Sequence, residues 1–223
     1  NNANPLAISL GNPELKPSFT HSFNASWNLA QTDPVQRSYT FNTNFRTTQN
    51  ATANRTEYND VTGGRISMPV NISGNWNASA NFNFNTQLKD KRFRINTGSN
   101  YNHTTAHSYV YRSAEHATVM NTMNSNNVRQ SLRFTFRDEF DRTPYWWDED
   151  EAANSYRRDN FEINLHANFG YNRNRSSATA ASNLDTYTYS YGISANYQFW
   201  FGLNLNTDIN QSSRRGYAEE IMN

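Results

Sequence analysis

Apolar and polar side chains alternate along residues 70–84, and this stretch organises the rest of the chain. The apolar set, interrupted by Gly74, consists of Val70, Ile72, Trp76, Ala78, Ala80, Phe82 and Phe84. The intervening positions hold Asn and Ser. A period of two is typical of a β-strand with one apolar and one polar face. After a turn at residues 89–91 the pattern resumes with Phe93 and Ile95 on the apolar side, which predicts a long antiparallel hairpin.

The same alternation recurs elsewhere and predicts about eight strands. They cover residues 19–29, 35–46, 70–84, 93–111, 128–137, 161–171, 187–199 and 203–210. Long polar connections are expected at residues 48–64, 113–127 and 173–185, and short turns between the other strands. Outer-membrane barrels have short turns on the periplasmic side and long loops outside. Residues 138–159 are the exception, because they are long where a short turn is expected. The outer half of 93–111 is too polar for lipid and is expected to project above the membrane.

The polar side of these strands distinguishes a membrane barrel from a soluble β-sandwich. Asn, Ser and Thr fill it, whereas the solvent face of a soluble sandwich usually carries charged residues. Arms of roughly 15 residues exceed the common strand length of about 5–6 and suit a membrane crossing, which takes about 9–11 tilted residues. We therefore predict an all-β fold, an antiparallel transmembrane β-barrel segment. Residues 1–223 are expected to be part of one outer-membrane barrel domain.

Each face of the predicted strands has its own set of residues. The side chains predicted to face lipid are Phe23, Trp27, Phe41, Phe45, Trp76, Phe82, Phe84, Phe134, Phe136, Phe169, Tyr197 and Phe199. The side chains predicted to face the lumen are Asn42, Asn44, Arg46, Asn71, Asn75, Asn77, Asn81, Asn83, Arg94, Arg129, Arg133 and Arg137. In a plugged barrel such residues mostly hydrogen-bond the plug and water, so structural support is favoured over selective contact with a substrate.

Composition agrees with barrel strands. The chain has 14 Phe, 13 Tyr and 5 Trp, yet its mean hydropathy is −0.93 because Asn, Ser and Thr fill the alternate positions. Charged residues make up 17%, against roughly 25% in soluble domains. A net charge of +1 gives no reason to expect nucleic acid as a partner. The absence of Cys excludes disulfides and thiolate metal sites.

Several segments resemble TonB-dependent outer-membrane receptors. Residues 11–17 (GNPELKP) precede an aromatic alternating strand, as a G-N-P-x-L-K-P-like segment does before a late barrel strand in that family. Residues 69–76 (PVNISGNW), residues 86–93 (TQLKDKRF) and the closing Arg215-Gly216-Tyr217 with Met222-Asn223 are similar to the Bacteroidetes outer membrane protein beta-barrel branch. The resemblance covers nearly all of the chain. Its motifs mark strand and turn positions and not a ligand.

This resemblance implies a barrel of about 22 strands with a plugged lumen, which imports a scarce nutrient across the bacterial outer membrane with energy from TonB. The expected partners are outer-membrane lipid, the protein's own plug, the TonB system, and a surface lipoprotein or a larger outer-membrane complex. The chain departs from the family in carrying neither the plug nor a TonB-contacting segment, and in stopping before the terminal strand. It also begins without an initiating Met or a signal peptide, so we expect a mature piece of a longer protein.

Other candidate chemistry is weaker. The acidic run at residues 148–151 lacks the Gly and spacing of an EF-hand loop, so a solvated loop is favoured over a Ca²⁺ site. The neighbouring Tyr145, Trp146 and Trp147 are predicted to be an interfacial anchor or a partner contact rather than a platform for sugars. His103 and His107 would lie about 13 Å apart on a strand, too far to bind one metal. No nucleophile motif is recognisable, so we expect neither an enzyme nor a cofactor.

Three functions therefore stay open. The favoured one is energised uptake of a nutrient such as an oligosaccharide, a peptide or a metal chelate. The alternative is a barrel that no longer transports and is a structural subunit of an outer-membrane assembly, for which the long 138–159 segment would be a docking element. A soluble β-sandwich adhesin is the third, and it would require the aromatic side chains to pack between two sheets.

Overall fold

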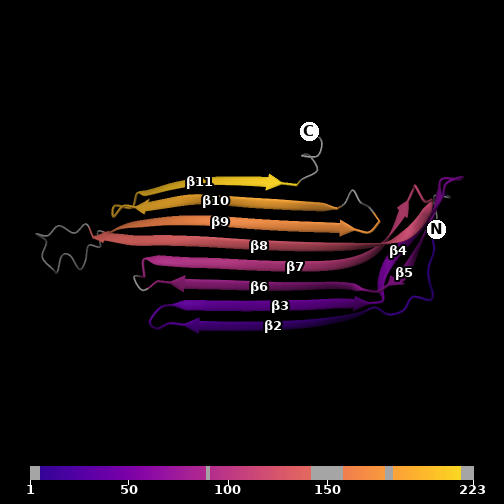
Figure 1. The fold of residues 1–223 in the computed structure, drawn as a ribbon, viewed down its shortest axis with the longest axis horizontal. Coiled ribbons are helices and arrows are strands. Elements are labelled where there is room, and N and C mark those ends of the chain that lie inside the picture. The colour runs from indigo at the N-terminus through magenta and orange to yellow at the C-terminus, as the bar shows by residue number, and fades with distance from the viewer. Residues whose placement is uncertain (1–5, 89–90, 142–157, 179–182, 217–223) are drawn as a thin grey trace, which may run out of the picture.

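The chain folds into strands arranged in two sheets (Figure 1). The computed structural model describes residues 6–88, 91–141, 158–178 and 183–216. Within them, no helix is long and apolar enough to cross a membrane. The strands are β1 (Ala7–Ser9), β2 (Phe19–Gln31), β3 (Arg37–Gln49), β4 (Ala51–Asn59), β5 (Gly64–Ile72), β6 (Asn75–Gln87), β7 (Phe93–Arg112), β8 (Ala117–Asp141), β9 (Arg158–Ser176), β10 (Leu184–Gln198) and β11 (Asn204–Arg215).

The larger sheet has eight strands in the order β11-β10-β9-β8-β7-β6-β3-β2. Every neighbouring pair is antiparallel. Within the described residues the edge strands β2 and β11 do not pair with each other, so the sheet is an open wall. The all-β antiparallel barrel segment of about eight strands that the sequence predicts is confirmed by this sheet.

The smaller sheet has three strands in the order β1-β5-β4 and projects beyond one end of the larger sheet (Figure 1). We call this end the loop end, and the opposite end, where β2 turns into β3 and β10 into β11, the turn end. Beyond the Ala106–Met123 pair, the β7–β8 hairpin continues past the larger sheet as well. This part of the hairpin and the three-stranded sheet together form what we call the outer extension.

Two sequence-based expectations about the loop end were wrong. Residues 48–64 are not a polar loop, because β4 and the start of β5 form a hairpin within them. Residues 113–127 are also largely strand, since β8 begins at Ala117 and pairs with β7 up to Arg112. Strands outside a membrane need no apolar face, and β4 and the start of β8 carry no regular alternation that the sequence analysis could detect.

The stretch of residues 70–84 is two strands rather than one. Strand β5 ends at Ile72 and belongs to the smaller sheet, while β6 begins at Asn75 in the larger sheet. Gly74 between them has a φ of 96°, a conformation that favours glycine. A Cβ there would also lie 2.9 Å from the His107 ring. The gap that Gly74 leaves in the apolar pattern therefore marks a change of sheet.

The segment expected to break the pattern at residues 138–159 is shorter than expected. Strand β8 continues through Asp141, and β9 starts at Arg158, which pairs with Asp141. The connection between them leaves from the turn end, and residues 142–157 lie outside the described part of the chain.

Apolar burial is scarce. Among the described residues, the buried hydrophobic side chains are Ile72 and Ala178. By contrast Phe23 and Ile209 are 63% and 65% exposed. Within the described ranges, the larger sheet therefore has no second sheet packed on its aromatic face, which is the arrangement that a soluble sandwich would need.

Candidate membrane and lumen surfaces

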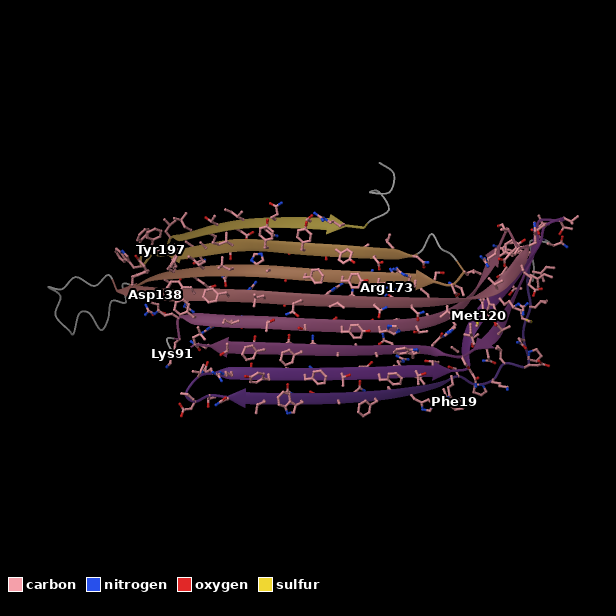
Figure 2. All side chains as sticks on the ribbon, in the orientation of Figure 1. Phe19, Lys91, Met120, Asp138, Arg173 and Tyr197 are labelled. Atoms are coloured by element: carbon pink, nitrogen blue, oxygen red, sulfur yellow. The ribbon has the colours of Figure 1, made fainter. Side chains whose placement is uncertain are left out.

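One face of the larger sheet collects the aromatic and aliphatic side chains. Residues paired across an antiparallel ladder lie on the same face, and the register links Trp27 to Phe41 and Phe41 to Phe82. Further pairings carry this face through β7, β8, β9, β10 and β11. The register thus places the side chains predicted to face lipid together, with Phe199 directly after β10. Figure 2 shows the rings along the strands.

Aromatic rings mark both ends of this apolar face. Towards the turn end, Phe93, Phe136, Phe161 and Tyr197 form a continuous series with ring centroids 4.9 to 6.3 Å apart. Towards the loop end, the Tyr171 and Tyr187 rings lie 4.9 Å apart, and Phe45 contacts Trp76. We call these the turn-end row and the loop-end row.

The separation of the aromatic rows matches a membrane. Phe161 pairs with Tyr197 and Tyr171 pairs with Tyr187, so the rows can be compared along β9 and β10. From Phe161 to Tyr171 the strand rises by about 33 Å at roughly 3.3 Å per residue. A strand tilt of about 40° reduces this to a vertical height of about 25 Å, which is the height of the apolar band in outer-membrane barrels.

The opposite face of the larger sheet is polar and holds all the residues predicted to face the lumen except Asn71. Pairs such as Asn42–Asn81, Arg46–Asn77 and Arg94–Thr135 establish this face. Asn44 donates to Asn24 and Asn168 donates to Ser190, so side-chain amides bond across neighbouring strands. Asn71 instead lies on β5 in the smaller sheet, where its amide donates to the carbonyl groups of Lys16 and Asn50.

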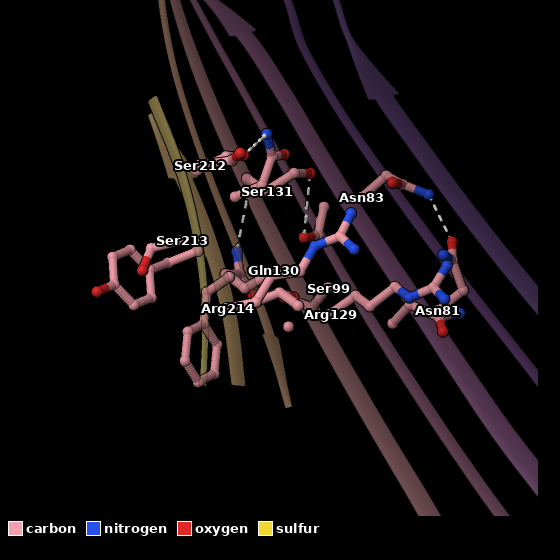
Figure 3. Close-up of a pocket in the computed structure, with 17 residues that line it drawn as sticks. Asn81, Asn83, Ser99, Arg129, Gln130, Ser131, Ser212, Ser213 and Arg214 are labelled. Atoms are coloured by element: carbon pink, nitrogen blue, oxygen red, sulfur yellow. Dashed lines mark hydrogen bonds between the residues drawn. The ribbon is translucent and has the colours of Figure 1, made fainter. Parts of the chain in front are cut away.

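The polar face is hollowed near its centre. A depression of about 530 Å³ there is lined by residues from β6, β7, β8, β9, β10 and β11, most of which, such as Asn81, Asn83 and Arg129, belong to the polar face (Figure 3). Its floor carries small residues such as Gly98, Ser131 and Gly170. Smaller depressions continue on the same face beside Asn42 and beside Arg94. A wall that is hollowed on its polar side is expected of a barrel with a water-filled or plugged lumen.

Arginine side chains border this central depression. Arg129 and Arg214 both line it, and Arg133 lines a neighbouring depression. None of these three has a hydrogen-bond or ion-pair partner among the described residues. Arg137 lies 3.9 Å from Glu139. The polar face can therefore bind oxygen-rich groups through free guanidinium and amide donors.

The outer extension is held together by side chains of β4 packed on β7 and β8. The Tyr58 and Tyr111 rings lie 4.6 Å apart, and the Arg55 guanidinium lies over the Tyr109 ring at 5.8 Å. Asp60 accepts a hydrogen bond from the Tyr111 hydroxyl at 2.6 Å and also bonds His116. The hydrogen bond from Tyr111 is the main cause, and the bond to His116 the second, that holds the pKa of the Asp60 carboxyl below its ordinary value. We call this set of contacts the seam.

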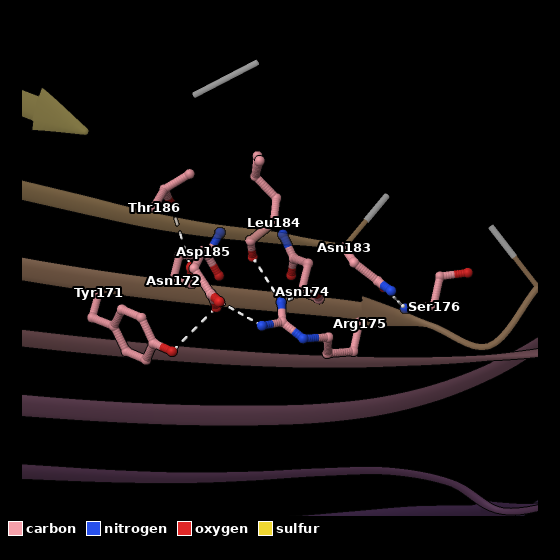
Figure 4. A network of polar contacts seen from close by, with 9 residues as sticks. All are labelled: Tyr171, Asn172, Asn174, Arg175, Ser176, Asn183, Leu184, Asp185 and Thr186. Carbon is pink, nitrogen blue, oxygen red and sulfur yellow. Dashed lines mark hydrogen bonds and ion pairs between the residues drawn. The ribbon is translucent and has the colours of Figure 1, made fainter. Parts of the chain in front are cut away.

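A separate polar network lies where β9 and β10 leave the loop-end row (Figure 4). The Arg175 guanidinium forms an ion pair with Asp185. The Tyr171 hydroxyl donates to the other oxygen of the same carboxylate at 3.2 Å. Arg175 also donates to the carbonyl of Asn174 at 2.8 Å. The network fixes the two strands to each other at the level of the aromatic row.

Sequence reasoning missed part of these surfaces. Arg214, Gly98 and Gly170 line the central depression but were not among the predicted lumen residues, although their even or odd positions in each strand would have placed them there. The seam joins residues more than 50 positions apart, such as Asp60 and Tyr111, so no local pattern signals it. Tyr145, Trp146 and Trp147, predicted to contact a partner, and the acidic run after them lie outside the described residues.

Comparison with known proteins identifies the family. Neither a curated protein nor a solved structure matches the chain. A sequence model of an outer membrane protein beta-barrel family matches residues 1–143, which cover β1 to β8. The fold agrees with this match, since the matched strands form one side of an antiparallel wall with an apolar and a polar face. The chain therefore belongs to the outer membrane protein beta-barrel family, whose members lie in the bacterial outer membrane.

Proposed function

We propose that this chain forms part of the wall of a TonB-dependent transporter that takes up a nutrient across the outer membrane. The nutrient is of the kind that needs energised import, such as an oligosaccharide, a peptide or a metal chelate. The resemblance of residues 11–17 and 69–76 to such receptors supports this assignment.

The observation that carries the proposal is the division of the larger sheet into two unlike faces. The aromatic face has rows of rings about 25 Å apart in height, so we assign it to lipid. The opposite face is hollowed and carries Asn amides and unpaired arginines, so we assign it to the lumen. Eight strands whose edges are unpaired in the part of the chain that the structure describes suit a wide barrel, because an eight-stranded barrel would close on itself and fill with side chains.

Growth of a bacterium that lacks only this gene tests the proposal. Cells would be supplied with one oligosaccharide, peptide or metal chelate at a time as the sole source of carbon or metal, at a concentration too low for passive entry. We expect growth to fail on one of these nutrients and to return when the gene is restored. A strain without TonB should fail on the same nutrient. Growth that needs this gene but not TonB would contradict energised transport, as would normal growth on every nutrient.

The second candidate is a structural subunit of an outer-membrane assembly. The sequence between β8 and β9 favours it, because β8 ends at Asp141 and β9 begins only at Arg158, both at the turn end, where barrels usually have short turns. Purification in mild detergent would distinguish the two candidates. A scaffold should retain other outer-membrane proteins in fixed ratio, and should lose them when residues 142–157 are replaced by a short Gly-Asn turn. A transporter should keep its uptake activity after that replacement.

A further inference from the structure

The loop end of the aromatic face carries a group of arginines that the lumen does not explain. Arg173 pairs in register with Asn126 and Asp185, and Arg215 pairs with Tyr187. Both therefore lie on the same face as Tyr171 and Tyr187, the face assigned to lipid. Arg173 is two positions beyond Tyr171 towards the loop end, and Arg215 lies in the loop-end row itself. Figure 2 labels Arg173 at this level of the sheet.

Positive charge exceeds negative charge in this group. Asp185 is already paired with Arg175 and accepts from Tyr171. Arg173 and Arg215 are exposed and have no hydrogen-bond or ion-pair partner among the described residues. A second carboxylate does not occur on this face of β8, β9, β10 or β11 near the loop-end row, within the part of those strands that the structure describes. Arg173 also acts on Asp185 through its charge, but neither Arg173 nor Arg215 uses its guanidinium donors within the described residues, so both can bind an anionic ligand.

The two free arginines are close enough to serve one ligand. Strands lie about 4.8 Å apart and residues rise about 3.3 Å, so the Cα atoms of Arg173 and Arg215 are roughly 12 Å apart across β10. Arg side chains lie along apolar surface and extend their charged ends towards the polar interface. Both can therefore reach over Tyr187 to the layer just above the hydrocarbon.

That layer holds the headgroups of the lipids, and its main anionic group is phosphate. Guanidinium groups bind phosphate oxygens with paired, charge-assisted hydrogen bonds. A ring of Tyr side chains at the same level is typical of the membrane interface. A solute in the lumen cannot reach the two arginines, because they are on the other side of the wall.

We propose that Arg173 and Arg215 bind the phosphate of a lipid headgroup in the outer leaflet. Tyr171 and Tyr187 contact the upper acyl chains of the same lipid, and the Arg175–Asp185 pair holds the β9–β10 edge of the site in place. The proposal rests on the assignment of the aromatic face to lipid, and it does not depend on transport.

The test measures lipid binding by the full-length protein purified in detergent. The probes are a monophosphorylated lipid A and the same lipid with its phosphate removed, and native mass spectrometry counts the bound lipid. The site variant carries Arg173→Gln and Arg215→Gln. The matched control carries Arg129→Gln and Arg214→Gln, which removes the same charge from the lumen face, and Arg214 is the direct neighbour of Arg215.

We expect the site variant to bind the phosphorylated lipid about tenfold more weakly than the wild type, because charge-assisted hydrogen bonds are lost. The control should bind it as the wild type does, and the lipid without phosphate should bind all three proteins alike. A variant with Arg173→Lys and Arg215→Lys should recover part of the binding, which also shows that the site tolerates substitution. Heat-dependent mobility on gels checks that each variant is folded.

Several results would overturn the proposal. One is that the site variant binds the phosphorylated lipid as tightly as the wild type does. Another is that the control variant loses as much lipid binding as the site variant. Competition by inorganic phosphate at the same concentration as the lipid would mean that the site binds free phosphate instead of a headgroup. Retention of an acidic protein, lost in the site variant while lipid binding is unaffected, would assign the arginines to a protein partner. A nitroxide attached at an Ile193→Cys substitution tests separately whether the aromatic face meets lipid. If the nitroxide lies in lipid but the site variant binds the phosphorylated lipid normally, the arginine site is wrong and the orientation of the sheet is right.

Discussion

Two regions of the molecule are stabilised in different ways. They are the apolar band between the aromatic rows and the outer extension. In the band, large apolar side chains such as Ile193 and Leu165 are exposed. In the outer extension and beside it, polar groups are buried, since Asn121 is 2% exposed and Thr105 is 8% exposed. The band therefore depends on its solvent being lipid, whereas the extension depends on hydrogen bonds of its buried polar side chains, including those of Asn121 with Ser176 and Ala178 beside it. The two regions should respond differently to the same kind of substitution.

The largest effect is expected from a charge in the middle of the band. Ile193 lies in register with Leu165 and Ile209, between the two aromatic rows. Replacing Ile193 with Arg should lower the free energy of unfolding in lipid vesicles by about 2–4 kcal/mol, the cost of placing Arg at the bilayer midplane. Urea titration in vesicles measures this.

The neighbouring residue is the matched control for that substitution. Ser194 lies on the polar face, opposite Asn164 and Asp208, so Ser194→Arg should change the free energy of unfolding by less than about 1 kcal/mol. Equal costs for the two variants would show that the faces do not meet different solvents.

The second-largest loss of stability is expected from substitution of Asn121 in the outer extension. Its Oδ1 accepts hydrogen bonds from the Ser176 hydroxyl at 2.8 Å and from the Ala178 amide at 3.0 Å. Asn121→Ala removes the acceptor of the buried Ala178 amide and one bond of the Ser176 hydroxyl, so we expect a loss of about 1–3 kcal/mol. Hydrogen exchange of residues 176–178 checks it. Met120→Ala, at an adjacent site that is 55% exposed, should leave this exchange unchanged, and a similar increase in both variants would argue against the assigned contact.

The seam should respond more weakly. Tyr58→Ala removes the ring that contacts Tyr111, and aromatic pairs contribute about 0.5–1.5 kcal/mol beyond their buried area. We expect amide exchange in β4 to become faster while exchange in β9 and β10 stays the same. Tyr58→Phe keeps the ring and should restore the slow exchange. Faster exchange throughout the larger sheet would mean that the extension and the band are not separate in stability.

The smallest effect is expected from the titration of Asp60, which should make amide exchange in β4 depend on pH. Its carboxyl has a lowered pKa because it is bonded to Tyr111 and His116. A carboxyl whose pKa is lower in the folded state than in the unfolded state stabilises the folded state at pH values above its ordinary pKa. This stabilisation is lost as the pH falls through the pKa of the folded state. Exchange in β4, corrected for the intrinsic rate, should therefore increase only below the ordinary value of 3.8. Asp60→Asn should abolish the dependence, and a dependence that survives this change would exclude Asp60 as its source.

The same contrast explains what the sequence predicts well. Inside the band, β9 and β10 carry apolar or aromatic side chains at every second position, so alternation reveals these strands and also tells which face each residue occupies. The predicted residues Phe169 and Arg129 lie on opposite faces as their positions require, since Phe169 pairs with Gln130 and Arg129 with Gly170. The thickness of the bilayer sets the height of the apolar band. The number of alternating residues in a strand therefore also predicts the length of its membrane crossing.

Outside the band the alternation stops and the sequence predicts less. Strand β4 has no apolar face, and it lies within residues 48–64, which were expected to be a polar connection. Its position depends on contacts such as Thr118 with the carbonyl of Thr56, which join residues 62 positions apart. The change of sheet at Gly74 was visible only as a gap in the pattern, since the positive φ that requires glycine is not a property of the sequence alone. Partners and substrate are not encoded in strand spacing at all.

The central claim is that the aromatic face of the larger sheet meets lipid and the Asn face meets water. The most direct measurement attaches nitroxides one at a time to single Cys substitutions at residues 190–197 of β10, which is feasible because the 223 residues contain no Cys. Collision rates with oxygen and with a water-soluble nickel complex are then compared in membranes. We predict that oxygen collisions dominate at the odd positions, including 191, 193 and 195, and that nickel collisions dominate at the even ones. Uniform values, or the reverse alternation, would contradict the account.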